Sequence, residues 1–329
     1  RYWVWLYNME NEIRQQCPLI FYTIWDDLPY PMWNREFYRS DDMLLCISKQ
    51  TKNLVENVLR DYPKPGRVKY VPHGIDEKKY YPIVNDFEFE AFKERILGED
   101  KDFVVLHVSR NIRRKNQSDI ILAWRTFLDQ LPIEKAKKCT LLLKTEAIFE
   151  HGTDLRAVAK NVAPNCKIVF SESKLSIQDL NAMYNVADVV VNIASNEGWG
   201  LSSTEAMLAG CPIINNVTGG LQDQCGFVED GPHGKWIRFN GEFPTNHMGK
   251  FKTHGVWAKP VFPSNRSLQG RVPTPYIFDD RCRPEDVADA MHYWWDMNLP
   301  LRVEYGQAGR EFCLDKGLTA KKMGEKIIE

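Results

Sequence analysis

The sequence contains no apolar run that approaches the roughly 20 residues needed for a membrane-spanning helix. Its eight cysteines form no C-x-x-C pair, so they indicate reduced thiols and a cytoplasmic location rather than a disulfide framework. The 43 basic and 44 acidic residues give a net charge of −1, which does not favour nucleic acid or an anionic membrane as the main partner. We therefore expect no transmembrane segment, and only peripheral contact with a membrane stays open.

The start of the chain also lacks two features. There is no initiator Met at Arg1, and the first residues, RYWVWLYNME, show no signal-peptide pattern. The length of 329 residues, with 43% apolar and 26% charged residues, is enough to bury one or two cores. Two domains are therefore the default expectation.

Strand-like and helix-like segments alternate through the middle of the chain. Short apolar runs predict strands over residues 103–109, 139–144, 167–170, 187–193 and 212–215. Apolar residues at helical spacing predict helices over residues 120–131, 154–162, 176–186 and 203–209. This alternation predicts an α/β fold with a parallel, doubly wound sheet, in which ligands bind at the carboxyl ends of the strands.

The most informative segment is NEGWGLSSTEAMLAGCPIINNVTGG, residues 196–220. Two carboxylates, Glu197 and Glu205, flank a glycine-rich turn that opens a predicted helix. The backbone N–H groups of this turn favour an anion such as phosphate, and carboxylates accept hydrogen bonds from ribose or hexose hydroxyls. Together they predict a nucleotide-sugar pocket. The residues with amides in the turn are Gly198, Trp199 and Gly200.

A simpler interpretation of Glu205 stays open at this point. Ser202 and Glu205 fit the S-x-x-E capping box, in which the glutamate only closes the start of its own helix.

The same segment resembles the GT-B fold retaining glycosyltransferases of the type 4 group (glycosyl transferases group 1), which use nucleotide-sugar donors. Their C-terminal domain carries an E-G-x-G-L…E-A-M…G-x-P pattern with seven residues between the two glutamates. The resemblance implies a GT-B fold, with two Rossmann-like doubly wound domains facing a cleft. The matching residues are Glu197, Gly198, Gly200, Leu201, Glu205, Ala206, Met207, Gly210 and Pro212.

A basic turn after the strand at 103–109 agrees with this resemblance. In the family a G-R-x4-K-G turn here supplies an arginine and a lysine to the donor diphosphate; Arg110 and Lys115 match, while Ser109 and Asn116 replace the glycines. Two cations and helix-end amides can stabilise the growing negative charge without a metal. From the residues alone, a solvated basic turn stays the alternative.

Lys144, at the end of the predicted strand 139–144, aligns with a position that often contacts the donor in relatives. An exposed surface lysine is the alternative for this residue.

The N-terminal part contains a second departure from the family pattern. A predicted strand over residues 18–24 leads into WDDLP, which resembles the H-D-L-x-P segment whose histidine approaches the donor sugar; here Asp26 occupies the histidine position. Asp26 or Asp27 could orient an acceptor hydroxyl or receive its proton. The alternative is that the pair caps a turn before Pro29.

The resemblance also sets the expected domains. Residues 1–85 form a partial N-terminal, acceptor-side domain, because they are fewer than the ~120 to 150 that a Rossmann-like half needs, so we expect its first strands to be missing. Residues 86–318 form the C-terminal nucleotide-sugar-binding domain, and 319–329 form a helix that crosses back. Within the second domain, residues 221–276 have no counterpart in the core pattern and form a long insertion, either a lid or acceptor-binding hairpin or a plain surface loop.

The resemblance implies a retaining, metal-independent transfer of a hexose from a nucleotide-diphospho-sugar, such as a UDP- or GDP-sugar, to the hydroxyl of a glycan or other acceptor. The expected catalytic residues are Glu197, Arg110, Lys115 and Asp26, and the expected donor-binding residues are Glu205, Gly198, Trp199, Gly200, Leu201, Ser202 and Lys144. No cofactor and no metal site are expected. The alternatives are a non-catalytic nucleotide-sugar-binding subunit and a glycosyltransferase that acts on modified nucleic-acid bases.

Overall fold

The computed structural model describes residues 4–62, 66–84, 87–98, 102–228, 245–271 and 274–329. Its largest sheet has six parallel strands in the order β6-β5-β4-β7-β8-β9. Counted from β4 this is the order 3-2-1-4-5-6 of doubly wound nucleotide-binding sheets. The expected parallel α/β fold is confirmed. The strands are β4 (Phe103–Val108), β5 (Cys139–Lys144), β6 (Ile168–Ser171), β7 (Val189–Asn192), β8 (Ile213–Asn216) and β9 (Ala258–Val261).

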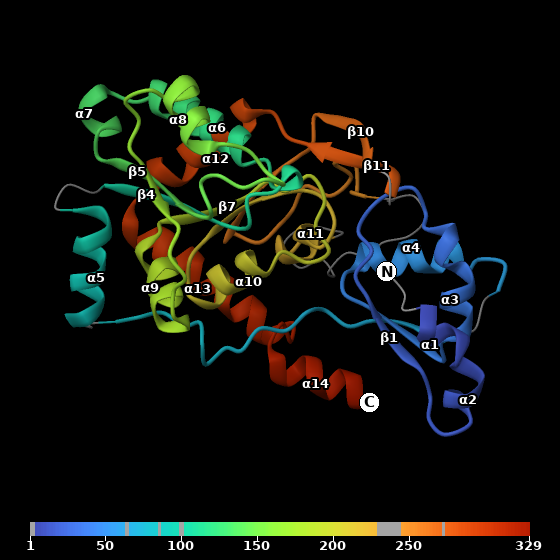
Figure 1. Ribbon diagram of the computed structural model, residues 1–329. Helices are drawn as coiled ribbons and strands as arrows, with labels where there is room; N and C mark the ends of the chain where they lie inside the picture. The colour runs from blue at the N-terminus through green and yellow to red at the C-terminus, as the bar shows by residue number, and fades with distance from the viewer. Residues whose placement is uncertain (1–3, 63–65, 85–86, 99–101, 229–244, 272–273) are drawn as a thin grey trace.

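Helices cover both faces of this sheet because its strands bury alternate side chains on each side (Figure 1). On β4, Val104 and Leu106 belong to one core cluster, while Phe103 and Val105 belong to the other. The first cluster draws on α5 (Phe87–Leu97), α9 (Ile177–Val186), α10 (Leu201–Leu208) and α13 (Leu299–Asp315). The second draws on α6 (Gln117–Asp129), α8 (Leu155–Val162) and α12 (Pro284–Asp296), with α7 (Ile133–Ala136) beside it.

The N-terminal part contains a smaller parallel sheet in the order β1-β2-β3. Its helix α4 begins where Ser48 accepts a hydrogen bond from the Thr51 amide, and Leu44, Val55 and Val58 form part of a small separate core. The elements are α1 (Val4–Asn8), α2 (Glu10–Arg14), β1 (Ile20–Thr23), the 3-10 turn η1 (Met32–Asn34), α3 (Arg35–Ser40), β2 (Met43–Cys46), α4 (Lys49–Val58) and β3 (Val68–Tyr70).

The last helix, α14 (Ala320–Ile328), begins beside the loop that follows β3. The Ala320 amide donates to the Ile75 carbonyl at 2.9 Å, and a Cβ on Gly74 would lie 2.2 Å from the Thr319 carbonyl oxygen. Only glycine allows this close approach. In Figure 1 the helix runs along the lower part of the view toward the N-terminal part of the molecule.

The region 221–276 is not wholly outside the core, which corrects the expected insertion. Its strand β9 pairs in parallel with β8 and extends the large sheet. The region also contains the short helix α11 (Leu221–Gln224) and strand β10 (Asn265–Arg271), which forms an antiparallel hairpin with β11 (Thr274–Arg281). Residues 229–244 of this region lie outside the described residues. Of the two alternatives for this region, the β-hairpin is present, and its role as a lid or acceptor-binding element stays a prediction.

Candidate active site

The candidate site lies where the order of the large sheet reverses, between β4 and β7. The turn after β4 contains the 3-10 turn η2 (Arg113–Lys115), and the loop after β7 contains Glu197. Two hydrogen bonds hold them together: the Ser195 amide donates to the Arg114 carbonyl at 2.8 Å, and the Asn116 side chain donates to the Ile193 carbonyl at 3.0 Å. Ligands of doubly wound sheets bind at this switch point.

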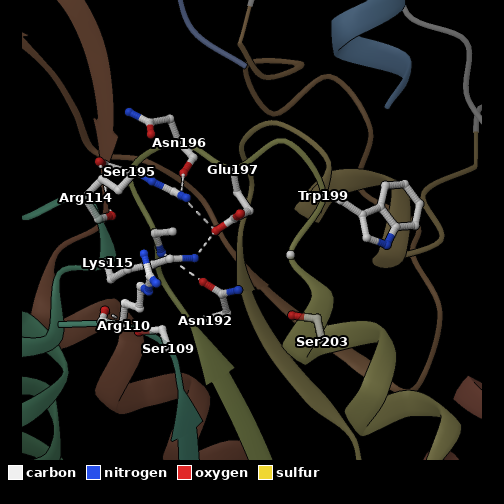
Figure 2. Close-up of polar contacts among 12 residues, drawn as sticks. Ser109, Arg110, Arg114, Lys115, Asn192, Ser195, Asn196, Glu197, Trp199 and Ser203 are labelled. Carbon is white, nitrogen blue, oxygen red and sulfur yellow. Dashed lines mark hydrogen bonds and ion pairs between the residues drawn. The ribbon is translucent and has the colours of Figure 1, made fainter. Parts of the chain in front are cut away.

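Glu197 receives two cations from the η2 turn (Figure 2). Lys115 forms an ion pair with the Oε2 atom of Glu197, and Arg114 donates to the same oxygen at 3.0 Å. Burial disfavours the charged carboxylate, but Lys115 and Arg114 together lower the pKa of Glu197 below its usual value. Glu197 is therefore ionised and fixed in place at neutral pH.

His107 supports this turn from inside the sheet. Its Nδ1 atom lies 2.8 Å from the Val191 carbonyl and its Nε2 atom lies 2.8 Å from the Ser109 hydroxyl. Burial lowers the pKa of His107 to about 4, so the imidazole is neutral at pH 7. A neutral histidine links β4 to β7 without adding charge to the site.

Helix α10 begins directly after the glycine turn. Gly200 is its N-cap residue, with φ of +91°, and no side chain caps the helix. Within the described residues, the N–H groups of Gly198, Trp199 and Gly200 have no acceptor. Three unpaired amides at a helix start suit an anion.

The capping-box interpretation of Glu205 is wrong. Ser202 lies inside α10 rather than at its N-cap, and Glu205 accepts a hydrogen bond from the Tyr184 hydroxyl at 2.6 Å. Burial raises the pKa of Glu205, an effect that hydrogen bonds from Tyr184 and Tyr80 oppose. The carboxyl group is therefore held by α9 and by the segment before α5, not by its own helix start.

The other residues expected to bind the donor lie around α10 in different orientations. Trp199 points away from Glu197 (Figure 2) and donates from its indole nitrogen to Thr204 at 2.9 Å, so only its backbone faces the turn. Leu201 is exposed at the first turn of α10, and Ser202 is half-buried.

Arg110 and Lys144 do not join the Glu197 ion pairs. Arg110 is exposed, and Lys144 is half-buried at the end of β5. The inward cation beside Lys115 is Arg114, which the family spacing did not single out. The turn geometry explains this, because η2 directs Arg114 and Lys115 toward the loop after β7.

A cleft of about 880 Å³ separates this site from the N-terminal part of the chain. One wall is formed by residues 112–114 and 196–201, and the other by residues 24–27 with Ile47 and His73. Gly270 and Ile277 of the β10–β11 hairpin also line it, as does His151. Lys115 and Glu205 are not among the residues that line this cleft.

Asp26 and Asp27 lie on the N-terminal wall. Gln50 donates to the Asp26 carbonyl at 3.1 Å, and the Trp25 indole donates to the Asp27 carbonyl at 2.7 Å. Burial, with smaller effects of Arg114 and Glu197 in opposite directions, raises the pKa of Asp26 to about 6. Burial and the neighbouring Asp26 and Asp279 raise that of Asp27 to about 9, so Asp27 is protonated at pH 7.

Three further residues beside the site were not expected from the sequence. Asp279 of β11 is fully buried, forms an ion pair with Arg113, and accepts a hydrogen bond from the Asn196 side chain at 2.9 Å. No local pattern could indicate this contact, because 166 residues separate Arg113 from Asp279.

The described residues contain no group of three or more His, Cys, Asp or Glu side chains that could hold a metal ion. No helix among them has the length and apolar character needed to cross a membrane. All eight cysteines are free.

Comparison with known proteins gives one family match and several relatives. Residues 88–237 match the family described as glycosyl transferases group 1. The chain is 26% identical over 189 residues to mannosylfructose-phosphate synthase of Agrobacterium fabrum, covering 56% of this chain and 39% of the relative. It is 36% identical over 220 residues to trehalose synthase of Pyrococcus horikoshii, covering 64% and 50%. The chain thus spans half or less of the length of these relatives.

Solved structures resemble the whole described fold. HepE of Anabaena, solved with UDP and glucose, covers 96% of this chain with a TM-score of 0.67 and 15% identity, and 72% of HepE is matched. Sucrose-phosphate synthase of Thermosynechococcus elongatus covers 96% of this chain with a TM-score of 0.62 and 18% identity, and 68% of that chain is matched. These neighbours are GT-B proteins, and the expected GT-B fold is confirmed.

Proposed function

Because residues 88–237 match the family described as glycosyl transferases group 1, we propose that the chain is a retaining glycosyltransferase of this family. It transfers a hexose from a nucleotide-diphospho-sugar to the hydroxyl of a glycan or other acceptor. The observation that carries this proposal is the constellation at the switch point: Glu197, fixed by Lys115 and Arg114, beside the unpaired amides that open α10. It offers an acceptor to sugar hydroxyls and donors to a diphosphate at adjacent positions.

The donor is bound through charge and hydroxyl recognition. The amides of residues 198–200 and the cations Lys115 and Arg114 stabilise the diphosphate, because preorganised donors act strongly in a water-poor cleft. Arg110 is exposed on the same turn, and we propose that it reaches the outer phosphate once the donor is bound. Glu197 accepts hydrogen bonds from the hexose hydroxyls and Glu205 from the ribose hydroxyls.

The transfer exchanges one bond at the anomeric carbon. The bond from this carbon to the phosphate oxygen breaks while a bond to the acceptor oxygen forms on the same face. The leaving phosphate oxygen takes the acceptor proton, so no strong protein base is needed. Asp26 and Asp27, on the opposite wall of the cleft, orient the acceptor hydroxyl.

We propose that no metal takes part. Lys115, Arg114 and the amides of the turn supply the positive charge that a divalent cation supplies in other enzymes. A cytoplasmic location, expected from the cysteine pattern, stays a prediction.

Incubating the chain with a panel of UDP-, GDP- and ADP-hexoses tests the function. We expect one member of the panel to release its nucleoside diphosphate, at a rate that EDTA does not change. We also expect an α-configured donor to give an α-configured product, which proton NMR detects. Lys115→Met should abolish this release, whereas Lys138→Met, on an exposed side chain, should not. If EDTA abolished the release of nucleoside diphosphate and Mg²⁺ restored it, metal independence would be contradicted.

Tight binding of a nucleotide sugar without release or transfer would instead favour a non-catalytic binding subunit. A glycosyltransferase acting on modified nucleic-acid bases has less support, because the net charge is −1.

A further inference from the structure

Strand β11 connects three parts of the molecule around the cleft. The Phe278 amide donates to the Leu28 carbonyl of the N-terminal part at 3.1 Å, and the Asp280 amide donates to the Ser195 carbonyl at 2.9 Å. The Asp280 carbonyl accepts from the Asn216 side chain, also at 2.9 Å. One strand of the hairpin therefore contacts the N-terminal wall, the loop after β7 and the end of β8.

The side chain of Asp279 lies at the centre of these contacts. It is fully buried, and its two carboxylate oxygens have different partners: Oδ2 pairs with Arg113 and Oδ1 accepts from Asn196 at 2.9 Å. Arg113 begins the η2 turn that ends in Lys115, and Asn196 directly precedes Glu197. A single carboxylate thus holds both segments that form the Lys115–Glu197 ion pair.

We propose that Asp279 is a positioning residue for the donor site: it fixes η2 and the loop after β7 relative to each other, and so sets the Lys115–Glu197 contact. This inference rests on the proposed function. Asp279 is fully buried and both of its carboxylate oxygens are paired within the fold, so it acts through Arg113 and Asn196 and not on substrate.

The neighbouring residue Asp280 provides a matched comparison. It is equally buried, at 1% exposure, but its side chain points to the other face of the strand. There it contacts Arg266 at 3.1 Å and the Thr218 and Asn246 side chains at 2.9 Å. A variant of Asp280 therefore weakens the hairpin without touching η2 or Asn196.

The test compares Asp279→Asn with Asp280→Asn at a temperature at which both variants are folded. The asparagine oxygen can still accept from Asn196, so Asp279→Asn mainly removes the ion pair with Arg113. We expect kcat/KM for the donor to fall about 10- to 100-fold, with a change in kcat, because small displacements of catalytic groups cost rates of this size. Asp280→Asn should lower Tm at least as much as Asp279→Asn does, but its kcat/KM should stay within about threefold of the wild-type value.

Arg113→Gln provides a second variant in case Asp279→Asn does not fold, because the Arg113 side chain is half exposed. Arg113→Gln should reproduce the loss of kcat/KM, and the variant that combines Asp279→Asn with Arg113→Gln should lose no more kcat/KM than either single variant. Wild-type kcat/KM in Asp279→Asn or Arg113→Gln would overturn the proposal. The proposal would also be overturned if kcat/KM fell in proportion to the decrease in Tm to the same extent in Asp279→Asn and Asp280→Asn.

Hydrogen exchange provides a readout that does not depend on activity. In Asp279→Asn the Ser195 amide, which donates to the Arg114 carbonyl, should exchange faster than in Asp280→Asn, and equal exchange in the two variants would overturn the positioning role. A wild-type chain that turns over no nucleotide sugar would refute the proposed function, while the exchange comparison would still decide whether Asp279 holds this loop.

Discussion

Replacing Asp27 by asparagine should make the fold more stable at neutral pH but not at acid pH. Asp27 is 9% exposed, and its Oδ1 atom has no hydrogen-bond partner among the described residues. Burial, Asp26 and Asp279 raise its pKa from 3.8 to about 9. The folded protein therefore holds a proton on this carboxyl that the unfolded chain releases above about pH 4.

The sign of the effect follows from this difference in proton binding. A carboxyl with a raised pKa contributes its full stability below the unfolded-state value and loses it as the pH rises toward the folded-state value. Each pH unit in this window costs about 1.4 kcal/mol, so the loss between pH 3.8 and pH 7.5 is at most about 5 kcal/mol. Asparagine has a similar shape and does not titrate, but its amide group adds roughly 1 to 3 kcal/mol for unmet hydrogen bonds.

We therefore expect Asp27→Asn to raise the free energy of unfolding by about 2 to 4 kcal/mol at pH 7.5. At pH 4 the benefit should disappear, leaving the variant equal to or less stable than the wild type. Urea unfolding at pH 4, 5.5 and 7.5 measures the difference at each pH. Asp296→Asn, on an exposed side chain near the end of α12, should change stability by less than about 0.5 kcal/mol throughout. A stability difference for Asp27→Asn that does not change with pH would refute the reasoning.

Four other changes have definite expected outcomes. Lys115→Met leaves Glu197 with one cation, so affinity for UDP or GDP measured by calorimetry should fall at least about tenfold, and nucleoside affinity much less; equal losses would contradict a diphosphate role. Glu205→Gln should weaken nucleotide binding by about 1.4 kcal/mol or more. If binding and turnover were unchanged, Glu205 would have only a structural role as the hydrogen-bond partner of the nearby tyrosines. Gly220→Ala should lower the free energy of unfolding by about 1 to 3 kcal/mol, because its Cβ would lie 2.4 Å from a backbone oxygen. Gly324→Ala, in α14 with open space around it, should raise it by about 0.5 to 1 kcal/mol; thermal and urea unfolding compare the two.

The strands of the large sheet were predictable where the local pattern was strong. Residues 139–144 form β5 with the predicted bounds, since a buried parallel strand needs a continuous apolar run and CTLLLK provides one. Strand β9 was missed, because its sequence AKPV contains a lysine and a proline and it lies at the edge of the sheet. Proline is tolerated on an edge strand, so the usual sequence signal for a strand is absent there.

The candidate site was predictable only in part. The spacing brings Lys115 and Glu197 to the same end of the sheet, and the structure places them in contact. Which other cation joins them depends on the η2 turn, whose geometry puts Arg114 rather than Arg110 beside the carboxylate. Asp279 depends on how the hairpin packs, and no local pattern encodes that contact.

Glu197 and Asp27, on opposite walls of the cleft, hold opposite protonation states at pH 7, and this difference bears on how a diphosphate can bind. On one wall Lys115 and Arg114 lower the pKa of Glu197, so it is ionised but compensated. On the other wall burial raises the pKa of Asp27 to about 9, so at pH 7 it carries a proton and no charge. An ionised Asp27 would repel the donor diphosphate across the cleft, whereas the protonated group can donate a hydrogen bond to a substrate oxygen. Donor affinity should therefore fall as the pH approaches 9 in the wild type, and fall less in Asp27→Asn, where this charge cannot form.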